Sequence, residues 1–170
     1  VIACKEFNST DEINQYLRAN YAGVYDPFLF SDMKKAVKRI EKAVRDNKVV
    51  YIYGDYDADG IMGTVILYKL LSLVSANVHA LLPNRFRQGY GLNMDVIDKL
   101  KDADTSLIIT VDNGIAAYEE ISYAKKKGID VIITDHHECA EDVPDAFCIL
   151  NPKAILTKSF AARRWPLSLP

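Results

Sequence analysis

The sequence contains little cysteine, and its three cysteines are scattered along the chain. Cys4, Cys139 and Cys148 form no Cys-x-x-Cys pair, which argues against a disulfide framework and favours a reducing compartment. Cys139 stands close to two histidines, but one thiol without a second thiol nearby is a weak basis for a structural zinc site. We therefore expect a cytoplasmic protein without disulfide bonds.

The chain also lacks a long apolar run and a strong excess of charge of one sign. No uninterrupted apolar segment reaches the roughly 18–20 residues that span a bilayer, and no secretory signal opens the sequence. With 21 basic and 23 acidic residues, the net charge is −2, unlike the basic footprint of a general nucleic-acid binder. We expect no membrane association, and any contact with nucleic acid would have to use a local patch.

Short apolar segments alternate with amphipathic helical patterns along most of the 170 residues. The strand-like segments are rich in β-branched residues, and the helical ones repeat apolar residues at intervals of three and four. Because parallel βαβ units produce this alternation, we predict a doubly wound α/β fold with a mainly parallel, five-stranded sheet flanked by helices. The predicted strands are 49–53, 76–83, 106–112, 129–135 and 146–152, and the predicted helices are 32–47, 61–74, 92–102 and 116–128.

The two ends of the chain depart from this alternation. Residues 1–30 look less regular and form an N-terminal extension, whereas residues 31–153 carry the predicted domain. Residues 154–170 contain the only tryptophan, a pair of arginines and two prolines, so we predict an irregular tail there.

The segment YGDYDADGIMG places Asp55, Asp57 and Asp59 at alternate positions, as an EF-hand calcium loop does. The twelfth position of such a loop should be an acidic ligand, but here it is Ile66. The flanking segments are a strand and a helix instead of two helices. The triplet therefore lies at a strand-to-helix turn, where open α/β sheets bind ligands.

Two further predicted strands end in chemically similar groups. Asp112 ends one strand in ITVDNGI, and Asp135, His136 and His137 end another in VIITDHHE. Because the carboxyl ends of parallel strands share one edge of the sheet, five carboxylates and two imidazoles are expected to converge there. So many negative charges repel one another unless cations lie between them.

The types of side chain at this edge indicate the metal and its chemistry. Carboxylates with imidazoles and no thiolate suit Mn²⁺, Mg²⁺ or Fe²⁺ better than structural zinc. Two such ions roughly 4 Å apart can lower the pKa of a bridging water and direct it at phosphorus. The alternative is structural: a single aspartate at a strand end is often a helix N-cap, and Asp59 and Asp112 could each serve in that way. His79, alone in its predicted strand, we interpret as a packed or surface residue.

The segment LPNRFRQGYG follows the second predicted strand and reaches the same edge. Arginine offers a bidentate fork for phosphate, and aromatic rings can stack on a nucleic-acid base. Asn84, Arg85 and Tyr90 are therefore candidate substrate contacts. The alternative interpretation is an ordinary exposed loop.

Five motifs occur in a fixed order along the chain: YGDYDADGIMGTVILYKLL, LPNRFRQGYGL, IITVDNGI, VIITDHHE and ILNPK. They resemble the first motifs of the DHH phosphoesterase family, which is named for the Asp-His-His group found here at positions 135–137. The residues around these motifs, and the segment YDPFLFSDMKKAVKRI before the first of them, resemble the RecJ-type members of the family. This resemblance covers about residues 23–153. The resemblance implies a 5′→3′ exonuclease on single-stranded DNA in repair or recombination, with two Mn²⁺ or Mg²⁺ ions. It also implies a single-strand-binding protein or a helicase as candidate partners.

The resemblance assigns a role to each residue at the predicted edge. The metal ligands it implies are Asp57, Asp59, Asp112 and His136, with Asp55 as a further ligand or a neighbouring acid. It implies that His137 contacts the scissile phosphate or the attacking water, and that Asp135 orients the imidazoles. Related pyrophosphatases have a histidine ligand at the position of Tyr53, so the role of this tyrosine is left open.

The family also needs another aspartate ligand well downstream, which this sequence lacks. The ending RRWPLSLP does not resemble the glycine-rich segment expected after NPK, and we hypothesise that the tail is a frameshift or gene-model artefact. Since the sequence starts at Val1 and not at Met, we expect a fragment or a trimmed product. Because the resemblance implies a further metal ligand and a substrate groove wall that this sequence lacks, we expect this N-terminal part to have weak or no activity alone. Two alternatives stay open: a phosphodiesterase acting on short oligonucleotides or cyclic dinucleotides, and a non-catalytic nucleic-acid-binding or assembly module.

Overall fold

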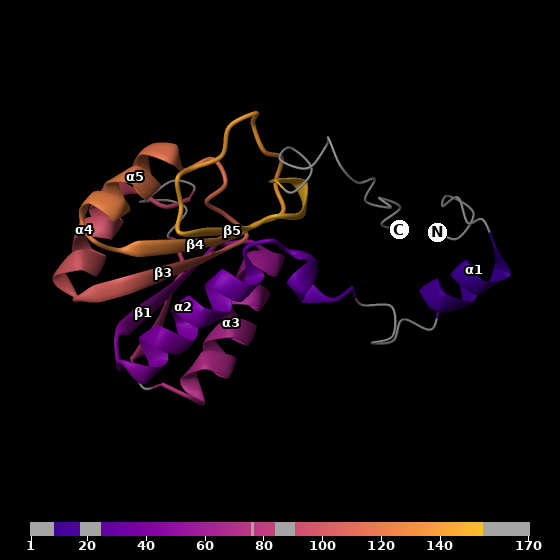
Figure 1. Cartoon of the computed structure of the whole chain (residues 1–170), viewed down its shortest axis with the longest axis horizontal. Helices are drawn as coiled ribbons and strands as arrows, with labels where there is room; N and C mark the ends of the chain where they lie inside the picture. The colour runs from indigo at the N-terminus through magenta and orange to yellow at the C-terminus, as the bar shows by residue number, and fades with distance from the viewer. Residues whose placement is uncertain (1–8, 18–24, 76, 84–90, 155–170) are drawn as a thin grey trace.

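The structure, a computed structural model, describes residues 9–17, 25–75, 77–83 and 91–154. Five parallel strands form one sheet in the order β2-β1-β3-β4-β5 (Figure 1). The strands are β1 (Val49–Gly54), β2 (Val78–Leu81), β3 (Thr105–Val111), β4 (Asp130–Thr134) and β5 (Cys148–Leu150). The helices are α1 (Thr10–Leu17), α2 (Met33–Arg45), α3 (Ala58–Ser72), α4 (Met94–Asp102) and α5 (Tyr118–Lys126), with a 3₁₀ turn, η3 (Pro27–Leu29). The predicted fold class is confirmed.

Alternate residues along each strand bury their side chains on opposite faces of the sheet. In β1, Val50 and Ile52 belong to a hydrophobic core shared with α2 and α3, whereas Tyr51 and Tyr53 face a second core shared with α4 and α5. Figure 1 shows these helix pairs on the two sides of the sheet. Because both faces are covered, the strands read as continuous apolar runs in the sequence.

The start of α3 packs very closely against the end of β1, and glycines make this packing feasible. A Cβ atom built on Gly54 would lie 2.0 Å from Oγ1 of Thr64, and one on Gly60 would lie 2.7 Å from Cβ of Asp55. Such distances exclude any larger side chain without movement of the helix. The first turn of α3 is therefore held directly over the turn that carries the aspartate triplet.

Helix α3 begins three residues earlier than the sequence indicated. Asp57 is its N-cap, and the Asp57 carboxylate accepts a hydrogen bond from the Gly60 N–H at 3.1 Å. We expected the helix to begin at Ile61, because the acidic triplet looked like a turn. An aspartate at the N-cap satisfies an otherwise unpaired N–H of the first turn, so the triplet itself starts the helix.

The outer side of α3 presents large apolar side chains to solvent. Met62, Ile66, Leu70 and Leu73 lie on one side of the helix and are each more than half exposed, Leu73 by 83%. Helix α3 is thus apolar on its outer side as well as on the side that packs against the sheet, although helices of this kind are usually buried. Within the described ranges no helix is both long and apolar enough to cross a bilayer; α3 has 15 residues.

The two ends of the chain differ in part from expectation. Residues 1–30, which we expected to be less regular, contain helix α1 and the turn η3. Residues 152–154 are helical and Ala154 is buried, so the first residue of the predicted tail belongs to the folded part. The rest of the predicted tail lies outside the described residues.

Candidate metal centre

Four neighbouring strands end at the same level, and a polar residue follows each of them. The last residues of β1, β3, β4 and β5 are paired across the sheet. The residues that come next are Asp55, Asp112, Asp135 and Asn151. The N–H groups of the three aspartates donate to the last carbonyl of the adjacent strand at 3.1, 2.9 and 3.2 Å. The hydrogen-bond ladder therefore extends one residue beyond the strands and fixes the backbone of the site.

The first acidic turn follows β1. Asp55 is buried, and its Oδ1 accepts the N–H of Tyr56 at 2.6 Å. Asp57, two residues later, caps α3 and lies at the positive end of the helix dipole, which stabilises its negative charge. This turn thus directs two carboxylates of different exposure toward the end of β3.

Asp112, after β3, has an unusual environment. Its backbone φ is +62°, a left-handed conformation that aspartate tolerates better than most residues. The residue is 7% exposed, and neither of its buried carboxylate oxygens has a hydrogen-bond partner among the described residues. Burial, with the nearby charge of Asp59 as the next cause, raises the pKa of Asp112 to about 6. A buried carboxylate without a donor is costly unless a cation approaches it.

The histidines that follow β4 face this carboxylate. Nε2 of His136 lies 2.8 Å from Oδ1 of Asp112, without forming a hydrogen bond, and Nδ1 of His137 lies 3.9 Å from the same oxygen. Asp135, which is buried, binds Nδ1 of His137 at 2.7 Å. Its Oδ1 also accepts the N–H groups of both histidines, and its Oδ2 accepts the N–H of Ile115. The hydrogen bond to Asp135 is the main cause that raises the pKa of His137.

Two groups of ligand atoms result from this arrangement, and both fit a divalent cation. In each group the ligand atoms lie within 4.8 Å of one another. The first group comprises Asp55, Asp57 and Asp112, and the second comprises Asp112, His136 and His137. Carboxylate oxygens with imidazole nitrogens suit Mn²⁺ and Mg²⁺ better than sites built from thiolates do. Asp112 belongs to both groups, and its carboxylate oxygens accept no hydrogen bond among the described residues; this is the observation that best fits a metal ion.

Asp59, an expected ligand, is near the two groups but belongs to neither of them. It is exposed on the first turn of α3, and its Oδ2 lies 3.6 Å from Nε2 of His136. A hydrogen bond shared with Asp57 is the main cause that lowers the pKa of Asp59, and the charge of His136 acts in the same direction. The structure thus brings Asp55, which the resemblance gave as a further ligand or a neighbouring acid, into a ligand group, and leaves Asp59 beside the two groups.

Tyr53, whose role was left open by the sequence, is engaged with the backbone before α4. Its hydroxyl donates a hydrogen bond to the carbonyl of Gly91 at 2.8 Å, and the side chain is fully buried in the core beneath α4 and α5. Burial raises the pKa of Tyr53 to about 12, so the hydroxyl stays protonated. Tyr53 therefore ties β1 to the start of the segment that leads into α4, and it belongs to neither ligand group.

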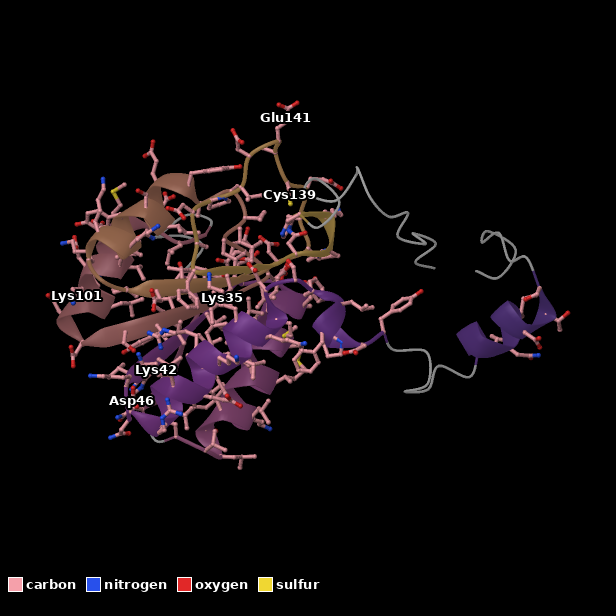
Figure 2. All side chains as sticks on the ribbon, viewed as in Figure 1. Lys35, Lys42, Asp46, Lys101, Cys139 and Glu141 are labelled. Carbon is pink, nitrogen blue, oxygen red and sulfur yellow. The ribbon has the colours of Figure 1, made fainter. Side chains whose placement is uncertain are left out.

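The remaining candidates divide into described and undescribed residues. Asn84, Arg85 and Tyr90 lie outside the described residues. Cys139 lies in the loop after β4 (Figure 2), and its Sγ is 3.9 Å from the carbonyl oxygen of His137; it belongs to neither ligand group. His79 is exposed and stacks on Tyr51, with ring centroids 5.0 Å apart, as expected for a surface residue.

Two buried asparagines beside the aspartates were missed by sequence reasoning. Asn113 follows Asp112 directly, and Asn151 follows β5 at the level of Asp135. Both are almost completely buried and hydrogen-bonded to the backbone of the site. The signal was present in the sequence, because each asparagine stands at the end of an apolar run, in ITVDNGI and ILNPK.

Comparison with known proteins gives the family. The family model described as "DHH family, N-terminal domain" matches residues 49–162. The single-stranded-DNA-specific exonuclease RecJ of Bacillus subtilis (strain 168) is 44% identical over 147 residues, which cover 86% of this chain and 19% of that protein. RecJ of Escherichia coli (strain K12) is 37% identical over 139 residues, which cover 81% and 24%. The chain therefore spans about a fifth to a quarter of the length of these curated relatives.

Solved structures agree with this assignment. A crystal structure of exonuclease RecJ bound to manganese aligns with a TM-score of 0.69 at 32% identity, over 76% of this chain and 33% of that chain. RecJ from Thermus thermophilus in complex with Mn²⁺ aligns with a TM-score of 0.63 at 30% identity, over 74% and 17%. A family model that matches most of the folded part, together with relatives above 30% identity, shows that this chain belongs to the DHH family.

Proposed function

We propose that the shared edge of the sheet is the metal-binding part of a phosphoesterase active site. In the complete protein, this site hydrolyses phosphodiester bonds of single-stranded DNA as a 5′→3′ exonuclease. The observation that carries the proposal is Asp112, whose buried oxygens lack hydrogen-bond partners among the described residues and are shared by both ligand groups. The relatives from Bacillus subtilis and Escherichia coli, both named single-stranded-DNA-specific exonucleases, support this choice of substrate.

The metal in this proposal is Mn²⁺ or Mg²⁺, with two ions in the complete enzyme. Manganese is present in the RecJ structures that align with this chain. Asp55 and Asp57 would hold one ion together with Asp112, and His136 would hold the other through Nε2; Asp59, beside His136, would complete the shell. Bound ions of this kind neutralise charge on the phosphate and lower the pKa of a water.

The surrounding side chains have separate tasks in this proposal. Asp135 accepts the proton on Nδ1 of His137, which fixes the tautomer and leaves Nε2 directed at the substrate side. The hydrogen bond to Asp135 also raises the pKa of His137, and whenever Nε2 carries a proton it would donate a hydrogen bond to an oxygen of the scissile phosphate. Burial of Asp112 and Asp135 excludes water from the base of the site and keeps these carboxylates in place.

The wider setting is proposed from the sequence. Asn84, Arg85 and Tyr90 would contact the phosphate and a base of the DNA strand. A role in DNA repair or recombination in the cytoplasm, next to a single-strand-binding protein or a helicase, fits a nuclease of this specificity. Most of the phosphate contacts would come from other parts of the complete protein, because this chain carries a net charge of −2.

A chimera tests the proposal under conditions where activity is expected. Residues 25–154 replace the matching part of Bacillus subtilis RecJ, and release of mononucleotides from 5′-phosphorylated single strands, duplexes and dinucleotides is measured with Mn²⁺. We expect activity on single strands that Asp112→Ala abolishes and that the exposed control Asp102→Ala retains. A preference for dinucleotides would favour the alternative phosphodiesterase. Mn²⁺ binding without hydrolysis would favour a non-catalytic module.

A further inference from the structure

The two ligand groups depend on the relative positions of three separate turns. These turns follow β1, β3 and β4, and they contribute Asp55 with Asp57, Asp112, and the two histidines, respectively. The ladder hydrogen bonds fix one backbone N–H in each turn. Side chains that cross from one turn to the next are needed to fix the rest, because metal ligands must hold their separation to within a fraction of an ångström.

Asn113 connects the first two turns. Its amide Nδ2 donates to the carbonyl of Tyr53 in β1 at 3.1 Å and to the carbonyl of Val111 in β3 at 2.9 Å. The backbone carbonyl of Asn113 accepts the hydroxyl of Thr110 at 2.7 Å. One side chain thus links the strand that leads to Asp55 with the turn that forces Asp112 into its left-handed conformation.

The two polar atoms of the Asn113 side chain differ: Nδ2 donates two hydrogen bonds, whereas Oδ1 accepts none among the described residues. The residue is 1% exposed, and its Oδ1 has no hydrogen-bond partner among the described residues. A buried acceptor without a donor destabilises a fold, whereas an apolar side chain of the same shape avoids that cost. The amide is therefore explained by the two bonds it donates across β1 and β3.

Asn151 connects the histidine turn to the end of the neighbouring strand. It is fully buried, and its Nδ2 donates to the carbonyl of His137 at 3.0 Å. Its Oδ1 accepts the N–H groups of Lys153 and Ala154 at 2.8 and 3.3 Å, which fixes the turn after β5. Asn151 thereby holds the carbonyl of His137, and Asp135 holds its imidazole.

We propose that Asn113 and Asn151 are positioning residues that set the geometry of the two ligand groups without binding metal themselves. Asn113 sets the separation of the Asp55–Asp57 turn from Asp112, and Asn151 sets the approach of the histidines to Asp112. The inference rests on the proposed metal site, but it separately predicts how each asparagine changes the Mn²⁺ affinity and the imidazole coordination. Side chains that orient metal ligands in this way typically change metal affinity about 10–100-fold when removed.

The test measures Mn²⁺ binding by the 170-residue chain. Asn113→Leu and Asn151→Leu keep the side-chain shape and remove the donors, and Asn151→Asp keeps the acceptor for the turn while removing the donor to His137. The matched control is Asn77→Leu, because Asn77 donates in the same way to Asn47. Asn47 comes just before β1, whose far end leads to Asp55, and its neighbour Asp46 is labelled at the lower left of Figure 2, away from Cys139 near the top. Binding is followed by calorimetry, folding by thermal unfolding in EDTA, and imidazole coordination by pulsed electron paramagnetic resonance.

We expect Mn²⁺ affinity to fall about 10–100-fold in the site variants and less than about twofold in Asn77→Leu. Asn151→Leu and Asn151→Asp should weaken the imidazole-nitrogen signal of bound Mn²⁺, whereas Asn113→Leu should leave that signal intact. Unchanged affinity in folded site variants overturns the inference, as does an equal loss in Asn77→Leu. If the wild-type residues bind Mn²⁺ but the chimera that carries them releases no nucleotides, the proposed nuclease function is wrong and the inference about the asparagines is unaffected. The two failures are therefore distinguishable.

Discussion

Asp112→Asn should stabilise the metal-free protein and at the same time remove its stabilisation by Mn²⁺. The substitution keeps the shape of the side chain and removes its charge. Asparagine also tolerates the left-handed backbone at this position. In the absence of metal, the charged carboxylate is buried beside other acids and lacks hydrogen-bond partners among the described residues, so its ionisation destabilises the folded state.

The magnitude follows from the pKa. Burial raises the pKa of Asp112 from its ordinary value of 3.8 to about 6. At roughly 1.4 kcal/mol per pKa unit, this difference corresponds to an upper bound of about 3 kcal/mol at about pH 7.5. Allowing for relaxation around the site, we expect Asp112→Asn to raise the free energy of unfolding by about 1–3 kcal/mol, or the Tm by about 3–10 °C.

The same reasoning gives the direction of the pH dependence. A carboxyl group whose pKa is raised on folding stabilises the folded state while it is protonated, below its unfolded pKa. That stabilisation is lost as the pH rises through the folded value of about 6. The metal-free protein should therefore lose stability between about pH 4 and pH 7, and Asp112→Asn should flatten this part of the profile.

Urea unfolding followed by circular dichroism in EDTA, and again with excess Mn²⁺, measures both effects. The wild-type protein should gain stability on addition of Mn²⁺, by the usual linkage to ligand binding, and the variant should gain little. Asp102→Asn, on an exposed residue at the end of α4, is the control for the loss of one charge. A metal-free Asp112→Asn protein that is less stable than wild type at about pH 7.5 would refute the reasoning. A variant that Mn²⁺ still stabilises fully would show that Asp112 is not a ligand.

Three further predictions concern the surroundings of the site. Gly54→Ala should destabilise the protein by about 2–4 kcal/mol in urea unfolding, because its Cβ would meet Oγ1 of Thr64 at 2.0 Å; a loss below about 0.5 kcal/mol would contradict this packing. Tyr53→Phe removes the hydroxyl that donates to Gly91 and should cost about 1 kcal/mol without changing Mn²⁺ affinity, and a large change in affinity would instead make Tyr53 part of the metal site. Leu73→Lys, at a position 83% exposed, should change stability by less than about 0.5 kcal/mol, and a larger loss in thermal unfolding would show that this side of α3 is covered.

The sheet and the shared edge were predictable because they depend on local patterns. β-Branched runs such as VVYIYG and SLIITV define strands, and the rule that ligands bind at the carboxyl ends of parallel strands brings Asp55, Asp112 and Asp135 together. Helix boundaries were less predictable. The N-cap role of Asp57 is one of several that an aspartate can take at a strand end, so the start of α3 was placed three residues late.

Other features depend on atoms that a sequence pattern does not position. The partner of its hydroxyl decided the role of Tyr53, which donates to the carbonyl of Gly91. Asn113 and Asn151 look like ordinary turn residues in the sequence, since asparagine is common where strands end. Their position at the end of an apolar run is visible in the sequence, but the task of each amide appears only when its hydrogen-bond partners are known. The grouping of Asp55, in place of Asp59, with Asp57 and Asp112 likewise depends on the depth at which each carboxylate lies.

The position of Asp112 in both ligand groups has a thermodynamic consequence for the proposed pair of ions. Two ions that share one carboxylate do not bind independently, and each must change the affinity of the other by the same factor. The first ion to arrive orders the Asp112 side chain, but it also takes up part of its negative charge and repels a second cation. The affinity of each group would therefore depend on whether the other group is filled. A titration with Mn²⁺ would then depart from the curve of two identical, independent sites.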